Sequence, residues 1–292
     1  MTPPEVSREV GPEVAVRVSA LTAYPVKSMA GVDLDVAVVE EQGLRGDRRW
    51  AVVDPDGVKV TAREEHALLA LRAEPMEGGG VRLLAPGSDA VDVAVPRGAA
   101  SVRVGFSGQD RAHPAGPDAD AWLSERVGRA LRLVWQGDAV HRPIRPDMGG
   151  QDGERNSLSD AAPLHVTSES SLQRLRDWMV ETALERGEEP AEPLRHDRFR
   201  PNVVIEGAEP FAEDGWRSVL VGDVPFRVTM VCDRCVMTTV DRAELSTAKE
   251  PIRTLARHRR WDGATWFGIR LTPVLPLAAD AVIRVGDAVV PG

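Results

Sequence analysis

Along most of the chain, apolar and polar residues alternate over short stretches, which is the pattern of a half-buried β-strand. Valines and a leucine occupy the even positions of residues 32–38, with aspartates at positions 33 and 35. Residues 50–53 and 58–61 are separated by an Asp-Pro-Asp-Gly turn, which predicts a hairpin. The same reasoning predicts further short strands within residues 81–104, 202–205, 219–231 (folded at Gly222-Asp223), 269–272 and 282–289.

Three segments instead have the apolar spacing of a helix. Residues 117–131 place Leu123, Val127 and Leu131 on one face and carry two aspartates in the first turn, where the helix dipole favours them. Residues 168–184 begin at a serine that can cap the helix and end before a glycine. Residues 251–259 begin with proline, and a shorter helix is predicted within residues 64–73.

Many short strands with three isolated helices favour a β-rich α+β fold of two barrel-like parts over a doubly wound sheet. Residues 1–14 are rich in proline and charge, which is typical of a loose tail. Residues 142–159 have almost no apolar periodicity and are rich in glycine, aspartate and arginine. We interpret them as the connection between two domains, residues 15–145 and 146–292, although their arginines could also reach an anion.

The composition limits the compartment and the partners. The 292 residues include 42% hydrophobic and 28% charged residues, as in a soluble globular protein. A net charge of −9 without a basic run argues against nucleic acid as a partner. No apolar stretch reaches the roughly 18 residues of a membrane helix, and the first residues lack the pattern of a signal peptide. We therefore expect a cytoplasmic protein that binds neither a membrane nor nucleic acid.

Both cysteines lie in one segment, Cys232-Asp-Arg-Cys235, followed by a β-branched stretch at residues 236–240. A redox dithiol should open a helix, whereas this stretch predicts a strand or loop. A zinc site needs two further ligands, and the six histidines are scattered. Two buried structural thiols are the ordinary alternative. A thiolate bound to a metal is a further one, which the adjacent Arg234 would favour.

Other motifs carry side chains suited to an anionic cofactor. Arg200 and Asn202 place a guanidinium and a carboxamide at the start of a predicted strand. Lys27 and Ser28 follow a rigid proline and could present an ammonium and a hydroxyl to a phosphate. Arg48 follows an aspartate with which it would ordinarily pair. Each motif taken alone has an ordinary structural interpretation.

In their order and separation these motifs resemble the MOSC family, specifically two-part members such as the mitochondrial amidoxime-reducing component and its bacterial relatives. The resemblance extends from about residue 16 to the end of the chain. It implies a MOSC β-barrel domain packed on an N-terminal β-barrel-like domain, with a few helices. It also implies the molybdenum cofactor, a molybdopterin, with Cys235 as the molybdenum ligand and Cys232 packed without binding metal.

By the same resemblance, both parts of the chain contact the cofactor. Asp233 and Arg234 match contacts beside the metal, and Arg234 is with Cys235 a candidate catalytic residue. Ala161 and Ala162 lie where relatives have hydroxyl residues, so only their backbone could contact the cofactor. The remaining cofactor-binding matches are Lys27, Ser28, Arg48, Arg200 and Asn202.

The resemblance implies an enzyme, an oxidoreductase that removes oxygen from nitrogen in N-hydroxylated small molecules with two electrons. No flavin or NAD fingerprint is present, two cysteines are too few for an iron–sulfur cluster, and no heme is expected. Electrons should therefore come from a separate ferredoxin, flavoprotein or cytochrome. Two alternatives remain open: a carrier of the cofactor or of sulfur without reductase activity, and a cofactor-free binding or structural protein.

Overall fold

The computed structural model describes residues 15–137 and 142–292, so the predicted tail at residues 1–14 lies outside them. Short β-strands dominate the described residues, as the alternating pattern predicts. The α-helices are α1 (Pro117–Val127), α2 (Glu169–Glu185) and α3 (Ile252–His258). The fold is a β-rich α+β fold, which confirms the predicted class. None of the helices in the described residues is long and apolar enough to cross a membrane.

The largest sheet joins strands from the two ends of the chain. Its order is β2-β1-β14-β13-β18-β16-β15-β20, and β17 pairs with β18. A smaller sheet, in the order β19-β3-β4, packs into the same apolar core. In chain order these strands are β1 (Arg17–Ala23), β2 (Val32–Leu34), β3 (Val36–Glu40), β4 (Gly43–Leu44), β13 (Leu164–Ser168), β14 (Val203–Glu206), β15 (Ser218–Val221), β16 (Val224–Asp233), β17 (Arg260–Trp261), β18 (Ala264–Pro273), β19 (Val282–Arg284) and β20 (Val289–Pro291).

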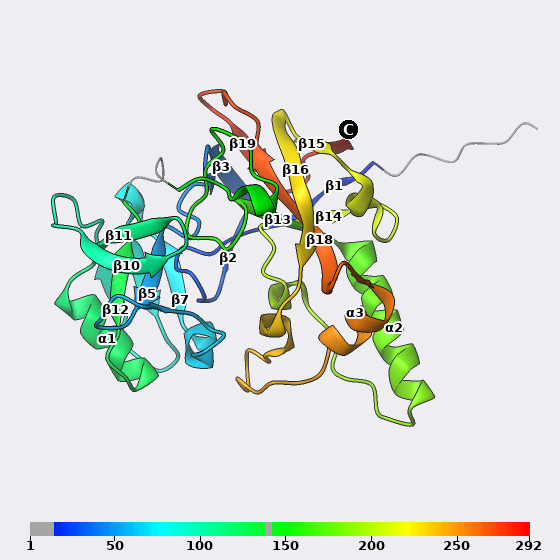
Figure 1. Ribbon diagram of the computed structural model, residues 1–292, viewed down its shortest axis with the longest axis horizontal. Coiled ribbons are helices and arrows are strands. Elements are labelled where there is room, and N and C mark those ends of the chain that lie inside the picture. The colour runs from blue at the N-terminus through cyan, green and yellow to red at the C-terminus, as the bar shows by residue number, and fades with distance from the viewer. Residues whose placement is uncertain (1–14, 138–141) are drawn as a thin grey trace, which may run out of the picture.

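A second body lies beside the large sheet and carries α1 (Figure 1). Its two sheets have the orders β10-β11-β12-β5-β6 and β7-β8-β9. They enclose a core around Trp50, Leu83 and Leu123, all almost fully buried. The strands are β5 (Trp50–Val53), β6 (Lys59–Val60), β7 (Arg72–Pro75), β8 (Val81–Leu84), β9 (Val91–Val93), β10 (Val102–Phe106), β11 (Gln109–Pro114) and β12 (Arg132–Trp135).

The chain crosses between the two bodies at the segments that hold the upstream motifs. The first four strands pack with the C-terminal half, since Val18 of β1 pairs with Ile205 of β14 and β3 pairs with β19. The loop after β1 reaches the other body, where Val26 bridges to Trp50. The chain then crosses to the second body between β4 and β5. Lys27, Ser28 and Arg48 therefore lie at the junction of the two bodies.

Helices α2 and α3 cover one face of β18 (Figure 1). The predicted stripe of α2, formed by Leu172, Leu175 and Met179, is buried against Leu255 of α3 and Phe267 of β18. This confirms the apolar period used to predict the helix. Ser168 precedes α2 as predicted, but its Oγ bonds the Oγ of Ser170 at 2.7 Å and does not cap a backbone N–H.

Several predicted boundaries were wrong. The first helix ends at Val127, not at residue 131, because Gly128 adopts φ 80° and its N–H bonds the carbonyl of Ser124. Residues 64–73 contain a short 3-10 helix (His66–Ala70) and the start of β7. Residues 236–240, predicted as strand or loop, form a 3-10 turn (Val236–Thr239).

Two predicted strands are each split in the structure. Residues 32–38 form β2 and β3, which separate at Asp35 and pair in different sheets. Residues 282–289 form β19 and the start of β20, which pair with β3 and β15 respectively. At the first break the buried face changes: Val32 and Leu34 of β2 are half-buried, whereas in β3 the odd positions 37 and 39 are buried and Val36 is 48% exposed. The alternation of the even positions continues through this break, so apolar periodicity does not mark it. The hairpin folded at Gly222-Asp223 is present as β15 and β16.

Candidate functional site

A cavity of about 390 Å³ is lined by residues from both bodies. The predicted site residues come from the loop after β1, the β4–β5 crossing, the connection before β13, the start of β14 and the end of β16. All ten lie on the wall of this one cavity: Lys27, Ser28, Arg48, Ala161, Ala162, Arg200, Asn202, Asp233, Arg234 and Cys235. Residues up to 208 positions apart in the sequence therefore meet at one place.

The cavity wall is strongly cationic although the chain carries a net charge of −9. Only Asp160 and Asp233 contribute carboxylates among the described lining residues. Such a concentration of one charge sign attracts anionic ligands. Ten lysines and arginines line the cavity: Lys27, Arg48, Lys59, Arg63, Arg142, Arg145, Arg198, Arg200, Arg234 and Arg270.

The cysteine segment leaves the large sheet at the edge of the cavity. Strand β16 ends at Asp233, which pairs with Trp266 of β18, and the N–H of Arg234 bonds the carbonyl of Thr265 at 2.8 Å. These contacts fix the backbone just before Cys235, whose thiol is half-buried. Cys235 then occupies the position that precedes the 3-10 turn. The local fold thus presents this thiol to the cavity from a fixed backbone.

Arg234 links the cysteine segment to β13. Its Nη1 donates to the Sγ of Cys232 at 2.9 Å and to the Nε2 of His165 at 3.2 Å, and its Nη2 donates to the carbonyl of Phe199 at 3.0 Å. Because a guanidinium can only donate, Nε2 of His165 is an acceptor and the ring proton lies on Nδ1. Burial, together with the charges of Arg234 and Arg270, holds the pKa of His165 well below its usual value. His165 is therefore a neutral acceptor in the cavity wall.

Cys232 and Cys235 have different surroundings. Cys232 is buried and receives the hydrogen bond of Arg234. Cys235 is more accessible and hydrogen bonds with Arg63, a residue of the other body. Burial opposes the charge of Arg63, but Asp160 and Cys235 together raise its pKa above the usual value. Both cysteines are free thiols in the structure.

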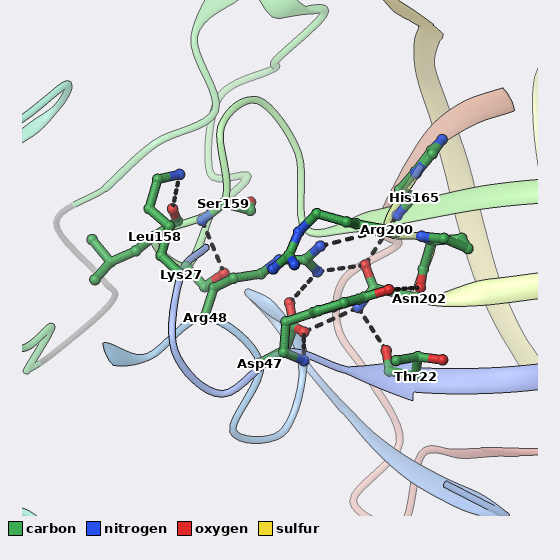
Figure 2. Close-up of polar contacts among 12 residues, drawn as sticks. Thr22, Lys27, Asp47, Arg48, Leu158, Ser159, His165, Arg200 and Asn202 are labelled. Carbon is green, nitrogen blue, oxygen red and sulfur yellow. Dashed lines mark hydrogen bonds and ion pairs between the residues drawn. The ribbon is translucent and has the colours of Figure 1, made fainter. Parts of the chain in front are cut away.

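Arg48, Asp47 and Asn202 form a buried network that joins the two halves of the chain (Figure 2). Nη1 of Arg48 donates to Oδ2 of Asp47 at 2.6 Å and to Oδ1 of Asn202 at 2.7 Å. Oδ1 of Asn202 also accepts from the N–H of His165 at 3.2 Å. Its Nδ2 donates to Asp47 at 3.0 Å and to the carbonyl of Thr22 at 3.1 Å. Asn202 therefore uses its full hydrogen-bonding capacity within the protein.

Tyr24 lies between two of the arginines. Its ring is 4.5 Å from the guanidinium carbon of Arg48 and 4.2 Å from that of Arg200, within cation–π range. Burial raises the pKa of Tyr24 to about 12 and lowers that of Arg200 to about 10. Arg200 donates to the carbonyl of Met29 at 2.6 Å and forms no ion pair with a carboxylate of the described residues. Its charge is thus compensated by a ring and a neutral carbonyl.

Three of the predicted site residues have left-handed backbones. The φ values are 72° for Ser28, 47° for Arg48 and 57° for Arg200. Non-glycine residues rarely adopt such values, and they persist only where surrounding contacts enforce them. Such strain is concentrated at binding and catalytic sites more often than elsewhere. The backbone at this junction is therefore shaped to direct these side chains.

Lys27 and Arg63 share one carboxylate. Nζ of Lys27 lies 2.5 Å from Oδ1 of Asp160. It also donates to the carbonyl of Leu158 at 2.8 Å, a bond that is drawn in Figure 2. Nη2 of Arg63 donates to Oδ2 of Asp160 at 2.8 Å. Burial lowers the pKa of Lys27, while Lys27 above all, and also Arg63, lower the pKa of Asp160. Asp160 is therefore ionised at any physiological pH.

The next two residues, Ala161 and Ala162, are buried, with 7% and 8% of their surface exposed. Neither has a polar side chain, so only their backbone groups can contact a ligand in the cavity. The carbonyl of Ala162 already accepts a hydrogen bond from the Oγ of Ser159 at 2.7 Å. These two residues line the cavity, but their side chains can neither hydrogen bond nor carry charge.

Among the lining residues that were not predicted as site residues are Arg63, Asp160, His165 and Arg270. Oδ1 of Asp233 accepts from Arg270, which also approaches Sδ of Met230 at 3.2 Å. These residues lie in separate segments with no recognisable local motif, so the sequence carries no signal for them. Arg142 and Arg145, by contrast, belong to the arginine-rich connection for which an anion was considered.

Comparison with known proteins matches two domain families to successive parts of the chain. The MOSC N-terminal beta barrel domain family matches residues 15–130, and the MOSC domain family matches residues 153–290. The chain is 30% identical to the mitochondrial amidoxime reducing component 2 of Rattus norvegicus, over 93% of this chain and 82% of that protein. It is 31% identical to the mitochondrial amidoxime-reducing component 1 of Homo sapiens, with the same coverage.

A second kind of relative is longer than this chain. The chain is 28% identical to the molybdenum cofactor sulfurase of Danio rerio, over 92% of its own length but only 34% of the sulfurase. Two kinds of protein with different names therefore contain a stretch similar to nearly the whole of this chain.

Proposed function

The chain belongs to the MOSC family, in the form that joins a MOSC N-terminal beta barrel domain to a MOSC domain, and from this we propose that it binds the molybdenum cofactor and reduces N-hydroxylated compounds. The observation that carries the proposal is the half-buried thiol of Cys235 on the wall of a cavity where Arg142, Arg200 and Arg234 form no ion pair with a carboxylate of the described residues. Names of relatives at about 30% identity supply the reaction type. An N-hydroxylated small molecule is the proposed substrate.

The residues of the cavity fit a cofactor that carries a phosphate and a dithiolene. Arg200 is held by a carbonyl and a ring, and Nε of Arg234 is buried without a hydrogen-bond partner among the described residues. Charged groups in such surroundings are stabilised when an anion supplies the missing partner. A thiol is also a suitable ligand for a soft metal centre.

We assign the cofactor contacts as follows. Cys235 would bind the molybdenum, and Lys27, Ser28, Arg48 and Arg200 would surround the phosphate and pterin. When bound, the cofactor supplies a two-electron couple that takes oxygen from nitrogen. Asn202 contributes by holding Arg48, because its own hydrogen-bonding groups are all occupied.

The protein's own side chains would stabilise the charge that develops on the departing oxygen and would hold Arg234 in its orientation. Arg63 and Arg234 place guanidinium groups on either side of the cysteine segment, where they can stabilise negative charge that develops on the departing oxygen. His165 stays neutral and keeps Arg234 oriented. Overall, the N–O bond breaks, two electrons and two protons are consumed, and the oxygen leaves as water. A separate ferredoxin, flavoprotein or cytochrome is the proposed electron donor.

A carrier of the cofactor or of sulfur is the second candidate. It is favoured by the match to molybdenum cofactor sulfurases over nearly the whole chain. A carrier would load with molybdenum but would not reduce an N–O bond. Activity measurements on the loaded protein therefore separate the two functions.

The test starts with protein made in a host that synthesises the cofactor and loads a control molybdenum enzyme. We expect near-stoichiometric molybdenum in the wild type and in Cys232→Ser, and none in Cys235→Ser, with all three proteins folded by circular dichroism. Loaded wild type should reduce benzamidoxime to benzamidine with an artificial electron donor. Loading without reduction would favour the carrier, and absence of molybdenum from the wild type would overturn both functions.

A further inference from the structure

The cavity contains a second group of cations in addition to those assigned to the cofactor. Resting on the proposed function, we propose that Arg142 and Arg145 form a second oxyanion site, which binds a carboxylate or phosphate carried by the N-hydroxylated substrate. Both residues line the same cavity as Cys235. The preferred substrates are then N-hydroxylated compounds with an anionic group, and neutral ones react less well.

Arg142 is a buried guanidinium without an ionic partner. Only 7% of its surface is exposed. Its Nε donates to the carbonyl of Ser107 at 3.1 Å, and its Nη1 donates to the carbonyls of Ser157 and Ser159. It makes no ion pair with a carboxylate of the described residues, and no hydrogen bond of Nη2 is present among them. A buried charge that meets only neutral carbonyls is stabilised when an anion binds beside it.

Like charges are gathered around Arg142. The pKa of Arg142 is lowered to about 10, mainly by burial and in small part by the charge of Arg145, while the carboxylate of Asp160 acts in the opposite direction. The charge of Arg142 in turn disfavours the protonated form of Lys27. Arg145 is half-exposed and pairs with Asp147 at 3.0 Å. Repulsion among these cations is relieved by an added anion, as it is in other anion sites.

The loop that carries Arg145 is held in one conformation. The carbonyl of Arg145 accepts from the N–H groups of Met148 and Gly150, at 2.9 and 3.0 Å. A side chain at Gly150 would lie 2.2 Å from the carbonyl of Ile144, so the backbone packs too closely for any other residue. Arg227 of β16 donates to the carbonyl of Gly149 at 2.7 Å. The backbone that carries Arg145 is therefore fixed against the large sheet, which lowers the cost of ordering the site when an anion binds.

The negative charges of the cofactor are too few to balance all the cations of the cavity, Arg142 and Arg145 among them. Ten cationic side chains line the cavity, together with the carboxylates of Asp160 and Asp233. Three further aspartates pair with lining arginines from outside the cavity, Asp47 with Arg48, Asp147 with Arg145 and Asp241 with Arg198, so five cationic charges remain in excess. A phosphate carries about two negative charges at neutral pH, and a thiolate adds one. The arginines assigned to the cofactor lie at the junction of the bodies, whereas Arg142 and Arg145 lie in the segment before β13. A substrate that enters the cavity with its own anion therefore meets cations that the cofactor does not neutralise.

The first measurement is binding to the cofactor-loaded protein by calorimetry. The probes are benzamide, 4-carboxybenzamide and 4-carbamoylphenyl phosphate, which contain no N–O bond. We expect both anions to bind about tenfold more tightly than benzamide, as a charge-assisted hydrogen bond predicts. In Arg145→Gln and Arg142→Gln this ratio should fall toward one, whereas it should persist in Arg284→Gln, an exposed arginine outside the cavity. Arg145→Gln changes an exposed side chain, so the test stands even if Arg142→Gln does not fold.

The second measurement is kcat/KM for benzamidoxime and 4-carboxybenzamidoxime. We expect the carboxylate to be preferred in the wild type and the preference to decline with added salt. Equal binding of neutral and anionic probes, or an unchanged ratio in Arg145→Gln, would overturn the second site. A binding preference without reduction of either amidoxime would refute the reductase but support the site. If the released cofactor carries a nucleotide, and Arg145→Gln lowers its loading, then the second anion belongs to the cofactor and not to the substrate.

Discussion

Nη1 of Arg48 donates a 2.7 Å hydrogen bond to Oδ1 of Asn202, across 154 residues of the sequence. Both side chains are buried, and Arg48 holds φ 47° to reach this position. The bond joins the crossing between the two bodies to the start of β14. Asn202 therefore positions a cationic residue of the cavity and does not offer a free group of its own.

The substitution Asn202→Ala should lower the free energy of unfolding by about 3 kcal/mol or more, since several buried partners lose their hydrogen bonds. Arg48, Asp47 and the carbonyl of Thr22 are the groups affected. Urea denaturation measures this change, with Gln173→Ala on the exposed face of α2 as the control. A loss below 1 kcal/mol would mean that the network does not hold the two halves together.

Two substitutions at Tyr24 separate its hydroxyl from its ring. Tyr24→Phe loses the 3.1 Å bond to the carbonyl of Pro201, at a cost of about 1 kcal/mol, and keeps the ring between Arg48 and Arg200. Tyr24→Leu removes the ring, which contributes about 0.5–2 kcal/mol for each cation. We expect molybdenum content close to wild type in the first variant and clearly reduced in the second. Equal loading of both variants would show that the ring does not position the arginines.

Lysine titration tests the pairing of Lys27 with Asp160. The chain has only three lysines, Lys27, Lys59 and Lys249, so selective isotope labelling gives three resolvable signals. One signal should titrate below the usual lysine range, because burial lowers the pKa of Lys27. Asp160→Asn should lower that pKa further by removing the attraction and the hydrogen bond of the carboxylate. Lys27→Arg should remove the low signal, and a variant that leaves it unchanged would contradict the assignment.

The sequence predicted well what depends on neighbouring residues. The stripe of Leu172, Leu175 and Met179 is buried as expected, because helix periodicity is a local property. The hairpin at Gly222-Asp223 also follows from local turn chemistry. The ends of the helices were less well predicted. Gly128 ends α1 through its left-handed backbone, and Ser168 bonds Ser170 where a cap was expected; apolar periodicity encodes neither property.

The candidate site was predictable only where a motif marks it. The MOSC resemblance led to the motif residues, and the structure brings them to one cavity. Their roles as cofactor contacts remain predictions. Arg63 and Asp160 could not be found in this way, because their pairing depends on how the β6 region packs against the connection before β13. The sequence likewise gives no sign that the carboxamide of Asn202 makes all of its hydrogen bonds within the protein. Its four partners come from distant segments and are brought together only by the fold.

Glu213 should give the folded protein a distinct pH dependence. Its side chain is fully buried, and both carboxyl oxygens lie within 3.0 Å of the Oγ of Ser171 on α2. Burial raises the pKa of Glu213 to about 7 from its usual 4.5. The folded state then binds more protons than the unfolded state between these values. The contribution of Glu213 to stability is therefore full below about pH 4.5 and is lost as the pH rises through about 7.

The substitution Glu213→Gln removes this titration while the amide oxygen can still accept from Ser171. Relative to wild type, the variant should gain up to about 3 kcal/mol in free energy of unfolding between pH 5 and pH 8. Urea denaturation at both pH values measures the difference, and Glu209→Gln, an exposed neighbour, is the matched control. Because both proteins share all other titrating groups, the pH dependence that those groups cause cancels in the comparison. Asp160 is one example, whose lowered pKa makes stability fall only at more acidic pH. Parallel pH profiles of wild type and Glu213→Gln would show that Glu213 is ionised in the folded state and that its burial is offset by contacts other than Ser171.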